Sequence, residues 1–224
     1  PLGYVAPPEA NRLPVFLVET DYGGETASDV IFTQLDDDDL PDLSVGRIPA
    51  RDADQVRTFV EKVLAYESGA GGGDDWRGRI LAVADGQEPH FGQDAQNFLA
   101  LFPEEQPVDL FAPPPGTAGA AGQIRERIEA GSALVAYFGH GSINMWGKDR
   151  LFTTEDVREL GNGGRLPIVV NMTCLTGLFT HPQVESLAEA LLWHPDGGAA
   201  AVLAPTSLTL PTDQTFLSLS LIHI

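Results

Sequence analysis

Apolar runs alternate with amphipathic segments along most of the chain, and this alternation predicts an α/β fold. Strands are expected at 80–84, 108–111, 133–138, 167–172 and 199–203, with helices at 94–101, 120–130, 153–160 and 184–193. Several of the strand-length runs are apolar at consecutive positions, which is typical of parallel strands covered on both faces. The pattern therefore predicts a three-layer α/β/α domain with a mostly parallel sheet.

The first 75 residues carry a second, smaller set of elements. The run 15–18 predicts a buried strand, and the weak alternation over 43–48 predicts another. Residues 52–68 predict a helix with Asp52 as its N-cap and Gln55 three residues later, because apolar residues recur with helical spacing at Val56, Phe59, Val60, Val63 and Leu64. The Gly-rich stretch 69–75 predicts a joint. We therefore expect a boundary at residue 75, between part of an N-terminal α/β subdomain (1–75) and a larger subdomain (76–224).

The ends of the sequence suggest a fragment of a longer chain. The sequence starts at Pro1, and the apolar stretch 217–224 stops without a cap or a turn. We therefore expect the fold to be truncated at both ends.

Charge narrows the classes of partner. The chain has 32 Asp and Glu against 13 Lys and Arg, a net charge of -19, which repels nucleic-acid phosphates and anionic membrane surfaces. No apolar run approaches the roughly 20 residues of a membrane-spanning helix. We expect neither a nucleic-acid partner nor a membrane span. The acidic run Asp36–Asp39 lacks the spacing of an EF-hand loop, and a solvated loop is the favoured interpretation over a metal site.

Three polar residues follow predicted strands directly: Asp85, His140 and Cys174. In open α/β sheets, ligands bind beyond the carboxyl ends of the strands, where neighbouring loops converge. Although these residues are far apart in the sequence, the topology is expected to place all three at one edge.

Cys174 is the only cysteine, so the chain has no internal disulfide. It is either a small buried hydrophobe or a nucleophile. A free thiol, with a pKa of about 8.5, is mostly protonated at neutral pH, and a neighbouring histidine can take that proton and later give it to a leaving amine. His140 is the candidate for this role. The backbone N–H groups of Gly141 and Cys174 are candidate oxyanion donors. Asp85 either orients the imidazole, shapes the pocket, or forms an Asp-Gly turn.

Several spaced blocks of the sequence resemble the gingipain-type cysteine peptidases. Segment 133–142 with Trp146-Gly147 resembles their histidine block, and 166–179 resembles their cysteine block. Further similarity, in consistent order, lies at 27–29, 41–49, 61–67, 186–191 and 198–207. A set of blocks in order is more specific than one short motif.

The resemblance implies a caspase-like fold, a His140/Cys174 dyad, and cleavage of protein or peptide substrates through an acyl-enzyme. Asp85 stands where arginine-specific members carry a catalytic Glu. Asp94 is the nearest match to the Asp at the base of their primary specificity pocket, which implies a preference for Arg or Lys. The resemblance also implies a secreted or cell-surface location, no required cofactor, and calcium as a possible structural ion.

Two alternatives to a cysteine endopeptidase remain at this point. One is a catalytically silent caspase-like module that serves as a binding scaffold, suggested by the acidic composition and the changed third residue. The other is a transpeptidase in which an amine instead of water resolves the same acyl-enzyme.

Overall fold

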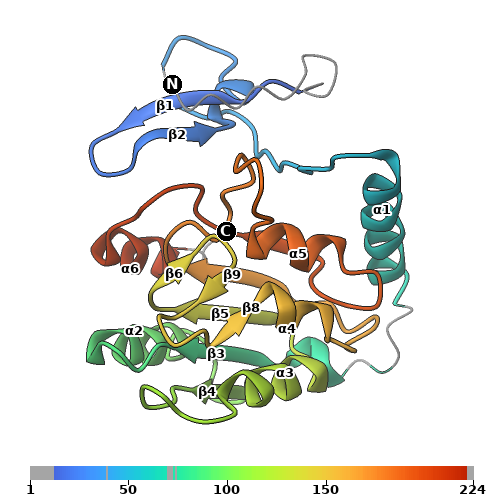
Figure 1. Ribbon diagram of the computed structural model, residues 1–224, viewed down its shortest axis with the longest axis vertical. Helices are drawn as coiled ribbons and strands as arrows, with labels where there is room; N and C mark the ends of the chain where they lie inside the picture. Colours follow the sequence, from blue (N-terminus) through green and yellow to red (C-terminus); the bar gives the residue numbers. More distant parts are fainter. Residues whose placement is uncertain (1–12, 39, 70–72, 74, 221–224) are drawn as a thin grey trace.

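A five-stranded parallel sheet forms the centre of the protein (Figure 1). The computed structural model describes residues 13–38, 40–69, 73 and 75–220. The strand order is β10-β9-β5-β3-β4, and the strands are β3 (Ile80–Ala84), β4 (Val108–Phe111), β5 (Leu134–Phe138), β9 (Ile168–Met172) and β10 (Ala201–Leu203). All five predicted strands of this sheet are confirmed, with ends shifted by two residues or less.

Helices cover both faces of the sheet. Alternate strand residues point to opposite faces, so one set packs with α3 (Ala120–Ala130), α4 (Thr154–Arg158) and α5 (Leu187–Trp193). The other set packs against Phe91, Ala95 and Phe98 of α2 (Pro89–Leu99). Helix α6 (Pro211–Ser220) contacts β9 and α2, and so belongs to this second layer. The predicted three-layer α/β/α architecture is confirmed.

A small antiparallel sheet follows β5 and was not predicted. It consists of β6 (Gly141–Ser142), β7 (Met145–Trp146) and β8 (Phe152–Thr153), paired in that order. Strands of two residues are too short to show a hydrophobic period, which explains why the sequence pattern gave no sign of them.

Two predictions for the first part of the chain are wrong. The strand expected at 15–18 exists as β1 (Phe16–Thr20), but within the described residues it pairs only with β2 (Gly24–Ser28), and its apolar side chains are exposed. The strand expected at 43–48 is absent. Side-chain contacts fix this segment instead of a ladder, since the Arg47 guanidinium binds the Asp29 carboxylate at 2.5 Å and the Pro14 carbonyl at 3.2 Å.

The helix ends follow their capping residues. Asp52 caps α1 (Ala53–Glu67) as predicted, accepting from the N–H groups of Asp54 and Gln55. Helix α2 begins five residues before the predicted start, with Pro89 in its first turn, a position that suits proline. Helix α5 begins at Leu187 rather than 184, because the Ser186 hydroxyl and the Glu189 carboxylate form a capping box there. Helix α6 was not predicted.

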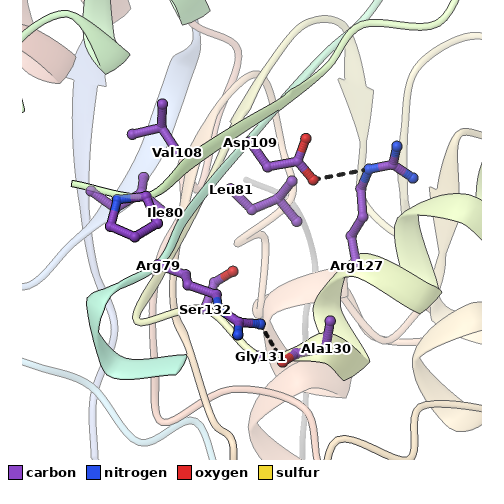
Figure 2. A pocket seen from close by; sticks show the side chains of 10 residues that line it. Arg79, Ile80, Leu81, Val108, Asp109, Arg127, Ala130, Gly131 and Ser132 are labelled. Atoms are coloured by element: carbon purple, nitrogen blue, oxygen red, sulfur yellow. Dashed lines mark hydrogen bonds and ion pairs between the residues drawn. The ribbon is translucent and has the colours of Figure 1, made fainter. Parts of the chain in front are cut away.

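A cavity lies at the amino ends of β3 and β4 (Figure 2). Arg127 contacts Asp109 at 3.1 Å on one side of it, and Arg79 donates to the Ala130 carbonyl at 3.3 Å on another. Because parallel strands run in one direction, this cavity is at the edge opposite to the residues that follow the strands. It is therefore separate from the predicted site.

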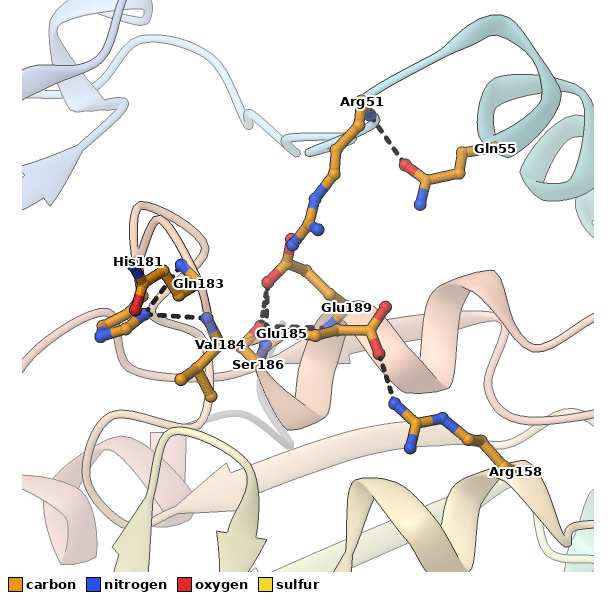
Figure 3. Close-up of polar contacts among 9 residues, drawn as sticks. All are labelled: Arg51, Gln55, Arg158, His181, Gln183, Val184, Glu185, Ser186 and Glu189. Carbon is orange, nitrogen blue, oxygen red and sulfur yellow. Dashed lines mark hydrogen bonds and ion pairs between the residues drawn. The ribbon is translucent and has the colours of Figure 1, made fainter. Parts of the chain in front are cut away.

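Two cations, Arg51 just before α1 and Lys62 on α1, contact the two ends of α5. At the first turn of α5, Arg51 pairs with the buried Glu189 at 3.3 Å, while the Arg51 N–H donates to the Gln55 side chain (Figure 3). At the last turn, the buried Lys62 ammonium donates to the carbonyls of Leu191, Leu192 and His194 at 3.0–3.2 Å. These carbonyls are the acceptors that a helix C-terminus leaves unpaired. The apolar stripe predicted on α1 is split, because Val56, Val60 and Leu64 are exposed.

The division of the chain at residue 75 stays a prediction. Residues 70–72 and 74, which belong to the predicted joint, lie outside the described residues. Among the described helices, none combines the length and the apolar composition that crossing a bilayer requires.

Lys62 is expected to make the stability depend on pH. Burial lowers the pKa of Lys62 from 10.5 to about 7, so between these pH values the unfolded chain binds more protons than the folded one. The free energy of unfolding therefore rises with pH in this window, by up to about 1.4 kcal/mol per pH unit. Denaturant unfolding from pH 7 to 10 should show a smaller rise in the free energy of unfolding per pH unit in Lys62→Met than in the wild-type protein. The exposed Lys148 provides the control, and equal slopes in Lys62→Met and Lys148→Met would contradict the prediction.

Candidate active site at the carboxyl edge of the sheet

The carboxyl ends of β3, β5 and β9 lie side by side. The register pairs Ala84 with Phe138, and Phe138 with Met172. The ladder continues past the strands, since the Asp85 N–H donates to the Phe138 carbonyl at 2.9 Å and the Gly139 N–H donates to the Met172 carbonyl at 3.2 Å. The loops that carry Asp85, His140 and Cys174 therefore start from one edge.

The histidine loop is fixed by its main chain. The His140 carbonyl accepts from the Tyr137 hydroxyl at 2.6 Å and from the Gly147 N–H at 2.8 Å. The imidazole meets the Phe91 ring of α2 edge-on, with centroids 5.2 Å apart. Its Nε2 is buried and has no hydrogen-bond partner in the part of the chain that the structure describes. Such orphaned buried polar atoms are rare and call for an explanation.

Gly141 brings the histidine loop into contact with the cysteine loop. A Cβ at this position would lie 2.3 Å from Thr173 Oγ1 and 2.9 Å from the Cys174 carbonyl oxygen, so only glycine permits the approach. The Gly147 N–H donates to the His140 carbonyl one position beyond the β6–β7 pairing, while the His140 N–H donates to Asp85. In an antiparallel ladder the bonding direction alternates from residue to residue, so the Gly141 N–H points away from β7.

Cys174 begins a sharp turn after β9. Leu175 has a φ of 63°, in the left-handed region that bulky residues rarely adopt, and its N–H donates to the Ser207 carbonyl at 3.0 Å. The Cys174 sulfur lies beside Thr209, whose N–H donates to Sγ at 3.4 Å. Among the described contacts, no hydrogen bond joins Sγ to the His140 imidazole. The two loops meet, but the Cys174 sulfur and the His140 imidazole have different neighbours.

Asp85 is buried and binds main-chain groups. One carboxylate oxygen accepts from the Gln87 N–H at 2.9 Å and the other from the His140 N–H at 3.3 Å. Gly139 allows this approach, because a Cβ there would lie 2.4 Å from the Asp85 Cβ. The contacts fit the turn and pocket-shaping interpretations of Asp85. They do not include the imidazole.

Asp94 lies on α2, one helical turn after Phe91. It is half-buried, and no hydrogen bond or ion pair engages its carboxylate within the described residues. Phe91 contacts the His140 ring, so Asp94 is on the helix that forms one side of the histidine.

A buried polar chain below the two loops was missed by the sequence analysis. Tyr137 stacks on Trp146 with centroids 4.5 Å apart, and the Trp146 indole donates to Asn171 Oδ1 at 2.6 Å. The Asn171 amide then donates to the Leu203 carbonyl at 3.3 Å. The chain links β5, β7, β9 and β10. The available signal was the two polar residues, Tyr137 and Asn171, inside otherwise apolar runs.

The Tyr137 hydroxyl stays a donor to the histidine loop. Burial, and secondarily the negative charge of Asp85, raise the pKa of Tyr137 well above its ordinary value. The phenol is therefore protonated throughout the neutral range and holds the His140 carbonyl.

The other described histidines form no hydrogen bond with His140 or Cys174, although the His90 ring lies against Phe91, with centroids 4.2 Å apart. His181 Nδ1 accepts from the N–H groups of Gln183 and Val184 (Figure 3), and His194 Nε2 contacts the Leu160 carbonyl. His90 is exposed, and His223 is outside the described residues. No three Asp, Glu, His or Cys side chains within the described ranges converge on a possible metal position. Asp39, part of the acidic run, lies outside them.

Gly139→Ala is expected to destabilise the protein by about 1–3 kcal/mol, the usual cost of overpacking. The added methyl would lie 2.4 Å from both Asp85 Cβ and Tyr137 Oη, so the base of the site must shift. Gly122→Ala on α3 is the matched control, because its Cβ meets nothing within 4 Å and alanine favours the helix. Denaturant unfolding of both variants checks the prediction. A Gly139→Ala protein as stable as the Gly122→Ala protein would contradict it.

Comparison with known proteins relates this chain to one family. Gingipain R2 of Porphyromonas gingivalis is 25% identical over 194 residues, which are 80% of this chain and 26% of that protein. Lys-gingipain of the same species is 23% identical over 190 residues, 78% of this chain and 11% of that protein. The matched part of this chain thus covers about a quarter of Gingipain R2 and about a tenth of Lys-gingipain.

Two solved structures share the fold. The crystal structure of the Arg specific cysteine proteinase gingipain R (RGPB) has a TM-score of 0.73 at 23% identity, over 88% of this chain and 49% of that one. A structure described as a protease has a TM-score of 0.74 at 18% identity, over 88% of this chain and 44% of that one. These likenesses confirm the caspase-like fold predicted from the sequence. The sequence profile of peptidase family C25 matches residues 4–223, and the chain belongs to this family.

Proposed function

We propose that this chain carries the catalytic centre of a cysteine endopeptidase, with Cys174 as the nucleophile and His140 as the general base and acid. The observation that carries the proposal is the contact of the histidine and cysteine loops at Gly141, at the ends of two adjacent parallel strands. The unpartnered Nε2 of His140 supports it, because a proton-transfer role explains a buried imidazole nitrogen with no partner.

The reaction follows from these groups. The imidazole takes the thiol proton, and the Cys174 thiolate attacks the carbonyl carbon of the scissile peptide bond, forming a C–S bond. The Gly141 and Cys174 N–H groups stabilise the resulting oxyanion. When the C–N bond breaks, the leaving amine takes the proton from the imidazolium. Water then attacks the thioester with His140 as base, which releases the acid and restores the thiol.

Asp85 acts through the main chain in this proposal. Its carboxylate binds the His140 N–H, and the Tyr137 hydroxyl binds the His140 carbonyl. The two contacts fix the N–H and the carbonyl of His140, the residue whose ring must face the sulfur. Asp85 is thus a positioning residue, whereas in the resemblance the acidic residue at this place is catalytic.

We propose that Asp94 selects substrates with Arg or Lys before the scissile bond. The carboxylate is half-buried, has no partner in the described part of the chain, and lies on the helix that contacts His140. A partly buried carboxylate without a partner attracts a cationic side chain. The names of the relatives, an Arg specific proteinase and Lys-gingipain, agree with this preference.

Cys174→Ala should abolish peptide hydrolysis by the full-length protein, and His140→Ala should reduce kcat/KM by about 10²- to 10⁴-fold. His194→Gln is the control and should keep full activity, because His194 follows the last turn of α5, near the amino ends of the strands, where its ring contacts the Leu160 carbonyl. Hydrolysis of peptide substrates, followed by mass spectrometry of the products, measures both effects. Unchanged hydrolysis in Cys174→Ala would refute the peptidase.

Asp94→Asn should lower kcat/KM for substrates with Arg or Lys before the scissile bond by roughly 10- to 100-fold, because the substrate cation loses its paired charge. Substrates with a neutral residue at that position are the internal control and should be cleaved at an unchanged rate. A uniform loss over all substrates would assign Asp94 a structural role instead.

A further inference from the structure

The Cys174 sulfur has a second neighbour besides the histidine loop. The Thr209 N–H donates to Sγ at 3.4 Å, the Thr209 hydroxyl oxygen lies 3.5 Å from Sγ, and the thiol lies 3.6 Å from the Thr209 carbonyl. The adjacent Leu208 and Leu210 are exposed, so the chain turns Thr209 alone toward the sulfur. This residue is 35 positions from Cys174 and takes no part in the dyad.

Thr209 belongs to a small hydrogen-bond network with Gln214 of α6. The Thr209 hydroxyl donates to the Thr173 carbonyl at 2.7 Å. The Gln214 amide, which is buried, donates to the same carbonyl and also to the Thr209 hydroxyl oxygen. The Thr173 carbonyl thus accepts from two donors, so it keeps one hydrogen bond, from Gln214, if the Thr209 hydroxyl turns away.

The segment before Thr209 is held by hydrogen bonds to the β1–β2 hairpin and to the cysteine loop. The Thr206 hydroxyl donates to the Ala27 carbonyl at 3.0 Å, and the Ser207 hydroxyl donates to the Gly23 carbonyl at 3.3 Å, both in the β1–β2 hairpin. The Ser207 carbonyl accepts from the Leu175 N–H, next to the nucleophile. Thr209 is therefore held in place relative to Cys174, and its contact with the sulfur does not depend on a free loop.

We propose that Thr209 stabilises the Cys174 thiolate and that Gln214 is a positioning residue that makes this possible. A hydroxyl has one proton to donate. While the thiol is neutral, the Thr209 hydroxyl donates this proton in a hydrogen bond to the Thr173 carbonyl. When the thiolate forms, the hydroxyl rotates to donate to Sγ, and Gln214 keeps the Thr173 carbonyl satisfied. The thiolate then has two donors from one residue, and donors to a charged sulfur favour its ionised form.

The assignment rests on the proposed function, but its test does not require hydrolysis. The rate of Cys174 alkylation by iodoacetamide, measured from pH 5 to 10 on the full-length protein, reports the thiolate fraction directly. Thr209→Val keeps the shape and removes the hydroxyl. It should move the midpoint of the profile to higher pH and slow alkylation at pH 7 about tenfold, the effect of one hydrogen bond to a charged group.

Three further variants complete the test. Thr209→Ser keeps the hydroxyl and should react as wild type, while Gln214→Leu should shift the profile in the same direction as Thr209→Val but less. Thr209→Val in a His140→Ala background should keep its shift, since it acts on the sulfur and not through the imidazole. Near-ultraviolet circular dichroism checks folding. If Thr209→Val does not fold, Thr209→Ser and Gln214→Leu decide the question.

The outcomes separate the two proposals. The role of Thr209 would be overturned if Thr209→Val had the wild-type alkylation profile, or if Thr209→Ser shifted the profile as much as Thr209→Val. If Thr209→Val does not fold, an unshifted profile in Gln214→Leu would overturn it. A hydroxyl-dependent profile in a protein that hydrolyses no peptide would support the role of Thr209 and reject the peptidase.

Discussion

The parallel pairing of β5 with β9 is the constraint on which the site depends. The register sets Phe138 opposite Met172, so the residues after each strand leave the sheet next to each other. Both strands are central and covered by helices on both faces. Their relative position is therefore set by the best-packed part of the protein, and a displacement of the two loops would require the core to move.

Polar groups complete the arrangement on both sides of that pair. Below the loops, the stacked Tyr137 and Trp146 and the Trp146–Asn171 hydrogen bond tie the histidine hairpin to β9. At the edge of the sheet, Asp85 holds the His140 main chain and Thr209 contacts the sulfur. Buried networks of this kind are strong only when their members are satisfied. Among the described residues at this edge, the His140 imidazole Nε2 and the neighbouring Thr173 Oγ1 are buried atoms that lack a partner. The imidazole is the group proposed to transfer protons.

The first part of the chain also reaches the site. The β1–β2 hairpin binds the segment that carries Thr209, and the Arg47 guanidinium, paired with Asp29, lies over the Phe179 ring, five residues after Cys174. Arg51, just before α1, and Lys62, on α1, bind the two ends of α5. Elements that the sequence pattern assigned to a separate subdomain therefore support the cysteine loop and the helix that follows it.

The sequence by itself determined the layers of the fold and the place of His140 and Cys174 at the edge of the sheet. Continuous apolar runs require burial on both faces, and a polar residue that ends such a run falls at the edge of the sheet, so His140 and Cys174 could be located from local pattern. The tertiary structure alone decided which groups meet there. Asp85 binds a main-chain N–H and not the ring, Thr209 reaches the sulfur across 35 residues, and two-residue strands form the histidine hairpin. Such contacts depend on how loops pack over a finished sheet. Hydrophobic periodicity carries no information about side chains brought together from distant loops.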